Sequence, residues 1–463
     1  MSPTIEEIRA ESVAGRMIAQ AMNAGGFDQT VYDKAQICLL DYFSCALEAR
    51  DLPWAKQAAS LATKQSSGAA LIGREGFASP HDAGFANGVA GHGLVREDMH
   101  TGAIAHLGVV IWPAVLAVAA REKISGQDLL DAAITGYEVG ARLGRAIMTT
   151  ELARLFRPTG LIGAAASSVA ISRLYGLTAD QALSAFALAI NASGGLNQWP
   201  HTGGSEMYFH PGFAVRNGIS CTDLARAGAV ASHTILEGEA GFFKAYARQS
   251  FDGEIDLFPD GQVEIMTVFN KQVPACNFAQ TPCQAAILAN AKTSGRQVTG
   301  IHIEASEAAV RYPGCDAKDG FNYALQAKMS ILFGVAAAIA RNEITEENYS
   351  RLEDAEIHRL IEASTLVENP EYTSAFPARQ GATVTLTLED GETVSASLED
   401  VVAADAGEIR SRFSKIAINT LGAERTNAII ATIDNLRNEP LAERLDSLSA
   451  LPEHSNLAKE ITR

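Results

Sequence analysis

The sequence predicts a mainly α-helical protein with two parts, a large all-α domain and a smaller α+β domain inserted late in the chain. Three observations support this prediction. Ala, Leu and Ile recur at three- and four-residue spacing through most of residues 4–246. Strand-like alternation occurs only after about residue 261, and the helical pattern returns from about residue 407. We therefore expect residues 1–265 and 405–463 to form the helical domain and residues 266–404 the α+β domain.

Several segments of the first part have the apolar repeat of helices. These expected helices are 31–48, 112–122, 126–144, 160–175 and 179–191. The segment GLIGAAASSVAISRLY at 160–175 is apolar nearly all round and rich in small residues. We therefore expect it to be a core helix that its neighbours approach closely.

The inserted part mixes two periods. Residues 298–305 (VTGIHIEA) and 382–388 (ATVTLTL) alternate as strands do. The turn signal Asp390-Gly391, followed by 392–398 (ETVSASL), predicts a β-hairpin. Amphipathic helices are expected at 281–294, 324–341 and 346–363. A small substrate is expected to bind in the cleft between the two parts.

Charge and composition exclude several classes of partner. The chain has 463 residues, with 37 basic and 54 acidic side chains and a formal net charge of −17. It carries no Lys/Arg run, so we expect neither nucleic acid nor an anionic membrane as a partner. The apolar stretches are shorter than the roughly 20 residues of a membrane-spanning helix. Six scattered cysteines and a polar N-terminus without an apolar leader predict reduced thiols and a cytoplasmic protein.

Titratable residues crowd the stretch from residue 81 to residue 113, between segments rich in Ala and Gly. They are His81, His92, Arg96, Glu97, Asp98, His100 and His106. Because burial and close neighbours shift pKa values toward neutrality, this density predicts a buried site for proton transfer. For any single histidine, helix capping or a surface position is the alternative.

Motifs for the common cofactors are missing from the sequence. There is no glycine-rich dinucleotide loop, P-loop or nucleophile elbow. Asp98, His100 and His106 lack a specific metal-ligand spacing, and no phosphate cradle near Lys271 suggests pyridoxal phosphate. We therefore expect neither a metal nor a cofactor.

Several runs resemble the MmgE/PrpD family, in the same order and over nearly the whole chain. ANGVAGHGLVREDMH (86–100) is similar to the family's ANG...HALDFDDTH, RPTGLIGAAAS (157–167) to HPTGT.GA.GAA, and KQVPAC (271–276) to K..P.C. The family includes 2-methylcitrate dehydratase and cis-aconitate decarboxylase. The resemblance implies a two-domain fold of the kind described above, a homodimer, no cofactor, and removal of a proton from carbon next to a carboxylate.

The chain departs from the family pattern at several positions. Val95 and Met99 stand at an Asp and a Thr, Arg157 and Gln280 at histidines, Met207 at a Lys and Phe333 at a Tyr. These departures remove acids that could protonate a leaving group. We therefore expect an isomerase, a cofactor-independent epimerase of an amino-polycarboxylate that takes and returns a proton with two bases. Among family members, the chain most resembles one that epimerises iminodisuccinate.

Two alternatives remain open. The first is a hydro-lyase or decarboxylase acting on a citrate-like tricarboxylate, and the second is a catalytically inactive binding protein. On either enzymatic interpretation the partner is a small anionic polycarboxylate.

The resemblance and the local sequence together give the expected site. His106 and Lys271 are the expected catalytic bases, although a charged Lys271 would bind carboxylate instead. Arg157, before a helix start, would offer a planar fork to a substrate carboxylate. The other expected substrate-binding residues are His210, Tyr208, Asp98, His100 and His201, with Asp98 orienting an imidazole or, alternatively, capping a helix.

Overall fold

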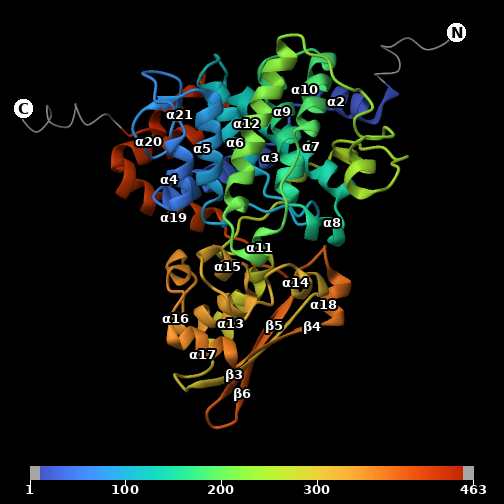
Figure 1. Cartoon of the computed structure of the whole chain (residues 1–463). Coiled ribbons are helices and arrows are strands. Elements are labelled where there is room, and N and C mark those ends of the chain that lie inside the picture. The colour runs from blue at the N-terminus through green and yellow to red at the C-terminus, as the bar shows by residue number, and fades with distance from the viewer. Residues whose placement is uncertain (1–10, 452–463) are drawn as a thin grey trace, which may run out of the picture.

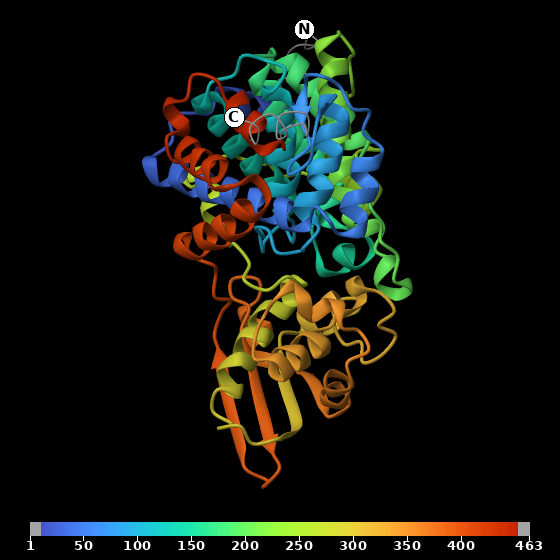
Figure 2. The ribbon, with the colours of Figure 1, turned by 90° about the vertical axis from the view of Figure 1, so that its left-hand side faces the viewer.

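A helical body lies above a smaller α+β part in the computed structural model, which describes residues 11–451 (Figure 1). The view turned by 90° shows the C-terminal helices packed beside the N-terminal ones in the body, while the sheet lies in the lower part (Figure 2). The mainly α-helical fold with a smaller α+β part is therefore confirmed. The domain boundaries at 265/266 and 404/405 remain a prediction.

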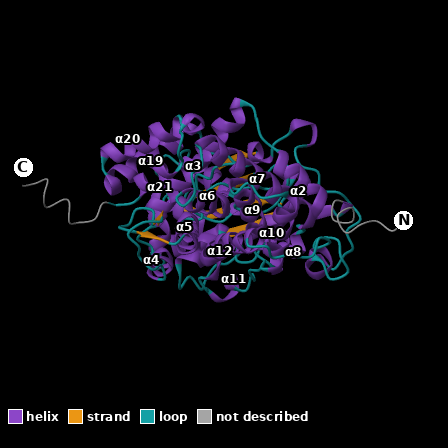
Figure 3. Cartoon of the chain, turned by 90° about the horizontal axis from the view of Figure 1, so that it is seen from above, coloured by secondary structure: helices purple, strands orange, loops and turns teal. Residues whose placement is uncertain are grey.

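The body is built around α9 (Pro158–Leu174), which is buried almost throughout. It packs against α6, α7, α10 and α12, and the view from above shows helices crowded around it (Figure 3). Small residues such as Gly163 and Ala166 allow this close approach. The helices of this part are α2 (Val13–Asn23), α3 (Gln29–Ala49), α4 (Pro53–Ser60), α5 (Pro80–His92), α6 (Gly108–Ala119), α7 (Gly126–Ile147), α8 (Thr150–Leu155), α9, α10 (Ala179–Asn191), α11 (Trp199–Thr202) and α12 (Glu206–Arg226), with the short pair β1 (Ala69–Ala70) and β2 (Phe77–Ala78).

The end of the chain returns to this body, as the sequence predicts. α19 (Ala406–Leu421) packs on α3, and α20 (Ala423–Asp434) and α21 (Glu443–Ser449) follow. Gly126, at the start of α7, donates its N–H to Glu439 O at 2.9 Å. A Cβ on Gly126 would lie 1.8 Å from Leu436 O, so only glycine permits this contact.

The α+β part carries a four-stranded sheet in the order β4-β3-β5-β6. β3 (Val298–Ala305) pairs antiparallel with β5 (Ala382–Leu388), which forms the predicted hairpin with β6 (Thr393–Leu398). β4 (Ser364–Glu368) pairs parallel with β3. The helices of this part are α13 (Gln280–Asn290), α14 (Glu307–Arg311), α15 (Ala324–Met329), α16 (Ile331–Arg341), α17 (Ala355–Glu362) and α18 (Pro370–Ala375).

Two predicted helices of this part are wrong in detail. The segment expected as one helix at 324–341 breaks at Ser330, whose extended backbone ends α15 and whose hydroxyl caps α16. The segment expected at 346–363 divides into a short 3₁₀ turn (Glu346–Ser350) and α17, which is followed directly by the unexpected strand β4.

The cysteines and the long helices agree with two sequence expectations. All six cysteines are buried free thiols. Within residues 11–451 no helix combines the length and the apolar composition that a bilayer crossing requires.

Asp446 on α21 gives the body a pH-dependent element of stability. Its carboxylate accepts the N–H of Ala70 at 2.8 Å and is 4% exposed, and burial raises its pKa to about 7. The unfolded carboxyl titrates near its ordinary value, about 3.9. The folded state therefore loses stability as pH rises from about 4 to about 7, because it must then hold a buried charge.

We predict that Asp446→Asn stabilises the protein at pH 8 and has little effect at pH 4. An amide oxygen keeps the bond to Ala70 without the charge, and a tenfold change in proton affinity on folding corresponds to about 1.4 kcal/mol. Thermal unfolding at both pH values measures this difference, with the exposed Asp33→Asn as the control. A gain of equal size at pH 4 and pH 8 would contradict the interpretation.

Candidate active site

A small cavity of about 20 Å³ lies where the helical body meets the α+β part. That volume holds about one water molecule. Its walls come from both parts of the chain: Val95, Met99, Ile104, His106, Arg157 and Met207 from the body, and Cys276, Asn277, Phe278, Tyr312 and Met329 from the other side. The cavity is thus a shared site between the two parts.

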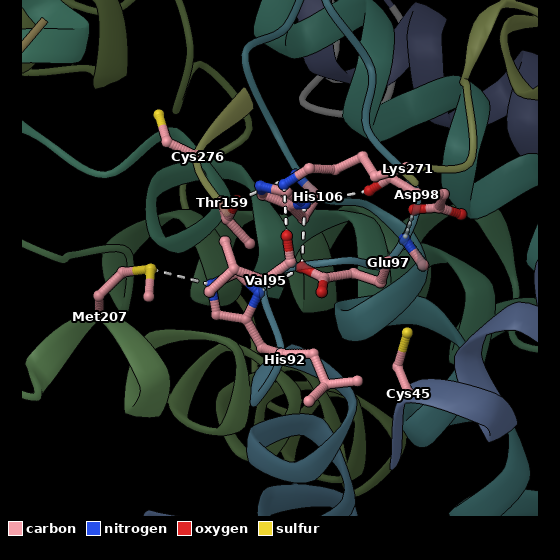
Figure 4. A network of polar contacts seen from close by, with 12 residues as sticks. Cys45, His92, Val95, Glu97, Asp98, His106, Thr159, Met207, Lys271 and Cys276 are labelled. Atoms are coloured by element: carbon pink, nitrogen blue, oxygen red, sulfur yellow. Dashed lines mark hydrogen bonds and ion pairs between the residues drawn. The ribbon is translucent and has the colours of Figure 1, made fainter. Parts of the chain in front are cut away.

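A single buried carboxylate, that of Glu97, organises the body side of this cavity. Its Oε1 contacts His92 Nδ1 and lies 2.9 Å from His106 Nδ1, and Figure 4 shows these side chains converging on it. Burial alone would raise the pKa of Glu97, but His92 and His106 hold it well below its ordinary value. Glu97 is therefore a permanent anion that orients two imidazole rings.

His106 has one ring nitrogen committed to the protein. Its Nδ1 also lies 3.0 Å from Asp98 O, and its backbone N–H donates to Thr159 Oγ1 at 3.0 Å. With Nδ1–H as the donor, the neutral imidazole carries its lone pair on Nε2. Burial lowers the pKa of His106 to about 3, which outweighs the raising effect of Glu97. The ring is thus a neutral acceptor before substrate arrives.

Two residues of this cavity have strained backbone conformations. Val95 and Ile104, both lining residues, have positive φ angles of 58° and 52°. β-branched residues rarely adopt this left-handed region, which costs on the order of 1–3 kcal/mol for each residue. The surrounding contacts must therefore fix the loop of residues 93–107 in this conformation.

Two buried lysines hold that loop from the α+β side. Lys271 Nζ donates to Val95 O and, at 2.5 Å, to Ala275 O, while Lys328 Nζ donates to Leu94 O at 2.9 Å. Burial lowers the pKa of Lys271 to about 8. Lys271 is not among the residues lining the cavity, and its amine lies against the Val95 carbonyl, close enough to His106 for their charges to interact.

Arg157 supplies the cationic group of the cavity wall. It directly precedes α9, is 6% exposed, and places Nη2 3.2 Å from His92 Nε2. Its Nε has no hydrogen-bond partner among the described residues. Burial raises the pKa of the facing Tyr312 to about 12, while Arg157 acts in the opposite direction. The unpaired N–H is a donor available to an anionic ligand.

Asp98 does not orient His106 through its carboxylate, which corrects one sequence expectation. Its Oδ1 accepts Gly108 N–H at 3.0 Å and its Oδ2 accepts the Tyr137 hydroxyl. Only its backbone carbonyl reaches His106. Burial raises the pKa of Asp98 to about 6. The alternative expectation, that Asp98 caps a helix, agrees with this contact in part. Gly108 is the first residue of α6, although Asp98 lies outside any helix and is not the residue that precedes α6.

The other predicted binding residues lie outside the cavity. His100 Nε2 contacts Glu264 at 2.7 Å. Tyr208 stacks on Trp54 and lines a hollow of about 740 Å³, while His210 lines a separate hollow of about 480 Å³. His201 is exposed in a polar hollow of about 730 Å³. Of the eight predicted site residues, His106 and Arg157 alone line the cavity.

Sequence reasoning missed His92, Glu97 and Cys276 as site residues. The first two belong to the titratable stretch already singled out, but nothing in their spacing distinguishes them from His81, which pairs with Asp223 at 3.5 Å instead. Cys276 closes the run KQVPAC and could have been noted for its proximity to Lys271.

His92, Glu97 and His106 lie close enough to hold a metal ion. Arg157 at 3.2 Å from His92 Nε2 and the nearby Lys271 ammonium oppose a further cation. The donor set is therefore better suited to hydrogen bonding, and the absence of a metal remains a prediction.

We predict that Gly108→Ala disrupts the site and Gly102→Ala does not. A Cβ at Gly108 would lie 2.6 Å from both Asp98 Oδ2 and Tyr137 Oη, so it would break the contacts that anchor the loop. At Gly102 the new Cβ meets only the guanidinium of the half-exposed Arg145, which can move. Chemical denaturation should show a loss of about 2 kcal/mol or more for the first variant alone. Equal stabilities of the two variants would refute this anchoring role.

Comparisons with known proteins match most of this architecture. The MmgE/PrpD N-terminal domain matches residues 17–253, and the MmgE/PrpD C-terminal domain matches residues 273–436. The cis-aconitate decarboxylase-like protein oryM of Aspergillus oryzae is 26% identical over 86% of this chain and 89% of its own length. Cis-aconitate decarboxylase of Aspergillus terreus is 24% identical over 80% of both chains, and 2-methylcitrate dehydratase of Salmonella typhimurium is 25% identical over 86% of both. The chain belongs to the MmgE/PrpD family.

Proposed function

We propose that this protein is a lyase acting on a small tricarboxylate of the cis-aconitate or 2-methylcitrate class. Its relatives include a decarboxylase and a dehydratase, and both matches extend over most of the chain. This favours the lyase alternative of the sequence analysis over the epimerase. A small anionic polycarboxylate as substrate and a homodimeric assembly are part of the same proposal.

One observation carries the proposal: His106, a neutral imidazole, and Arg157, whose buried Nε has no hydrogen-bond partner among the described residues, line the same small cavity. Arg157 can bind a substrate carboxylate, and His106 can exchange a proton with the carbon beside it. A bound carboxylate would raise the pKa of His106 from about 3 toward neutrality, because an anion stabilises the imidazolium form. Substrate binding would thus activate the base.

The cavity is too small for the proposed substrate, so the site must open before the reaction. A tricarboxylate does not fit into about 20 Å³, so the walls from the body and from the α+β part must separate to admit it. Tyr312 and Phe278 would then close over the substrate again. Closure would exclude water, which strengthens the interactions of the buried charges.

A specific observation keeps an epimerase as the second candidate. The two carboxyl groups nearest His106 are already committed, Glu97 to the histidines and Asp98 to Gly108 and Tyr137. Neither is free to protonate a departing hydroxyl group. Taking a proton from a stereocentre and returning it on the other face requires no such acid.

We predict that the protein converts cis-aconitate or 2-methylcitrate without an added cofactor. Proton NMR in deuterated water distinguishes the candidates. A new or rearranged double bond supports the lyase, whereas deuterium entering the stereocentre of iminodisuccinate with no new double bond supports the epimerase. His106→Asn should reduce either activity by about 100-fold or more. A wild-type protein that leaves all three compounds unchanged would exclude both proposals.

We predict that Arg157→Lys raises KM by about 10-fold or more, whereas Arg154→Lys leaves it within twofold. Lysine keeps the charge but loses the planar fork that a carboxylate binds. Arg154 is the matched control because it is exposed and lines the surface hollow of His201 rather than the cavity. Steady-state kinetics on the accepted substrate measures both variants, and an unchanged KM for Arg157→Lys would remove Arg157 from the binding site.

A further inference from the structure

We propose that Cys276 is a further catalytic residue, whose thiol exchanges a proton with the substrate carbon from the α+β side of the cavity. This inference rests on the proposed lyase function and deepens it. Cys276 lines the cavity together with His106 and Arg157, which belong to the opposite wall. Among the lining residues of the α+β side, it and Tyr312 are the ones with an ionisable side chain.

The backbone around Cys276 is held in place by the same lysines that hold the loop of residues 93–107. Cys276 N–H donates to Lys328 O at 2.8 Å, and the preceding carbonyl, Ala275 O, accepts from Lys271 Nζ at 2.5 Å. The Gln280 side chain reaches Cys276 O at 3.3 Å. These bonds fix the peptide groups on both sides of Cys276 and so fix the position of its thiol. Proton transfer requires such a fixed position, because donor and acceptor must lie within hydrogen-bond distance.

The surroundings of Cys276 also suit a thiolate. Its Sγ lies 3.9 Å from Cys315 Sγ, within reach of a thiol hydrogen bond. That bond, with the Lys271 and Arg157 charges, lowers the pKa of Cys276 to about 7 against the effect of burial. The other five cysteines have raised pKa values, and that of Cys283 is about 12. A pKa near the working pH is the one best matched to acid–base catalysis.

The proposed step balances for an unsaturated tricarboxylate such as cis-aconitate. The bond between the CH₂ carbon and its carboxylate breaks and releases CO₂, and its electron pair forms a new C=C bond. The electron pair of the original C=C bond takes the proton of the Cys276 thiol, so that the CH carbon of that bond becomes a CH₂ group. The thiolate left behind is stabilised by Lys271 and Arg157 and recovers a proton from water. No oxidant, reductant or co-reactant is needed.

Kinetics of three cysteine variants test this role. Cys276→Ala should lose at least about 100-fold in kcat, while Cys283→Ala, which removes another buried thiol away from the cavity, should stay within threefold of wild type. Cys315→Ala should keep turnover but move the thiol-dependent limb of the kcat pH profile to higher pH, because it removes the hydrogen bond to Cys276. Cys276→Ala with kcat within threefold of wild type would overturn the proposal.

A second measurement needs no turnover and so separates this proposal from the lyase assignment. Alkylation of the wild-type protein by iodoacetamide, followed peptide by peptide in a mass spectrometer, should label Cys276 at least about 10-fold faster than Cys283 at pH 7, with an inflection near pH 7. Labelling of the two thiols at equal rates would overturn the role of Cys276 even in an active enzyme. If Cys276 is labelled selectively but the protein converts none of the three polycarboxylates, both the lyase assignment and the catalytic step are overturned. Cys276 would then be a reactive thiol without a catalytic role.

Discussion

The interaction on which the site depends is the burial of one carboxylate, Glu97, between two imidazole rings. A buried anion is costly unless hydrogen bonds and nearby cations compensate for lost hydration. Here His92 and His106 contribute hydrogen bonds, and the charge of Lys271 adds to them. Removing any one of these partners leaves the remaining buried charges and polar groups without full compensation for their lost hydration. The site is therefore a single cooperative unit rather than a set of independent residues.

The need of buried polar groups for hydrogen-bond partners also explains where the two parts of the chain meet. The loop of residues 93–107 exposes the carbonyls of Leu94 and Val95 to the α+β part, and two lysines from that part take them. These contacts hold Val95 at a backbone angle that a β-branched residue otherwise avoids. Docking of the α+β part and conformation of the loop thus stabilise each other, and the cavity exists only when both are in place.

The sequence predicts what depends on local periodicity and misses what depends on pairing over distance. The helix expected at 179–191 and the strand expected at 298–305 match α10 and β3 because each follows one clear period. β4 was missed because a parallel edge strand has only β3 as its partner, more than sixty residues away. His106 and Arg157 were found through sequence resemblance, whereas His201 was chosen from an aromatic run in which Trp199 and Tyr208 are buried but His201 itself is exposed. Burial at the junction of the two parts, which selects the true lining residues, is not encoded in any single segment.

Closure and acid–base chemistry are physically linked at this junction. Burial is the main cause that lowers the pKa values of His106 and Lys271, and that burial requires the walls of both parts. When the walls separate to admit substrate, water would return both pKa values toward their ordinary range and the lysine would be fully charged. An open site therefore attracts an anion, and a closed site holds that anion against groups poised to exchange protons. Binding and reactivity then follow from one motion. The desolvation that costs energy on closing also sets the proton affinity of His106, which lines the cavity, and of Lys271, which holds the loop beside it.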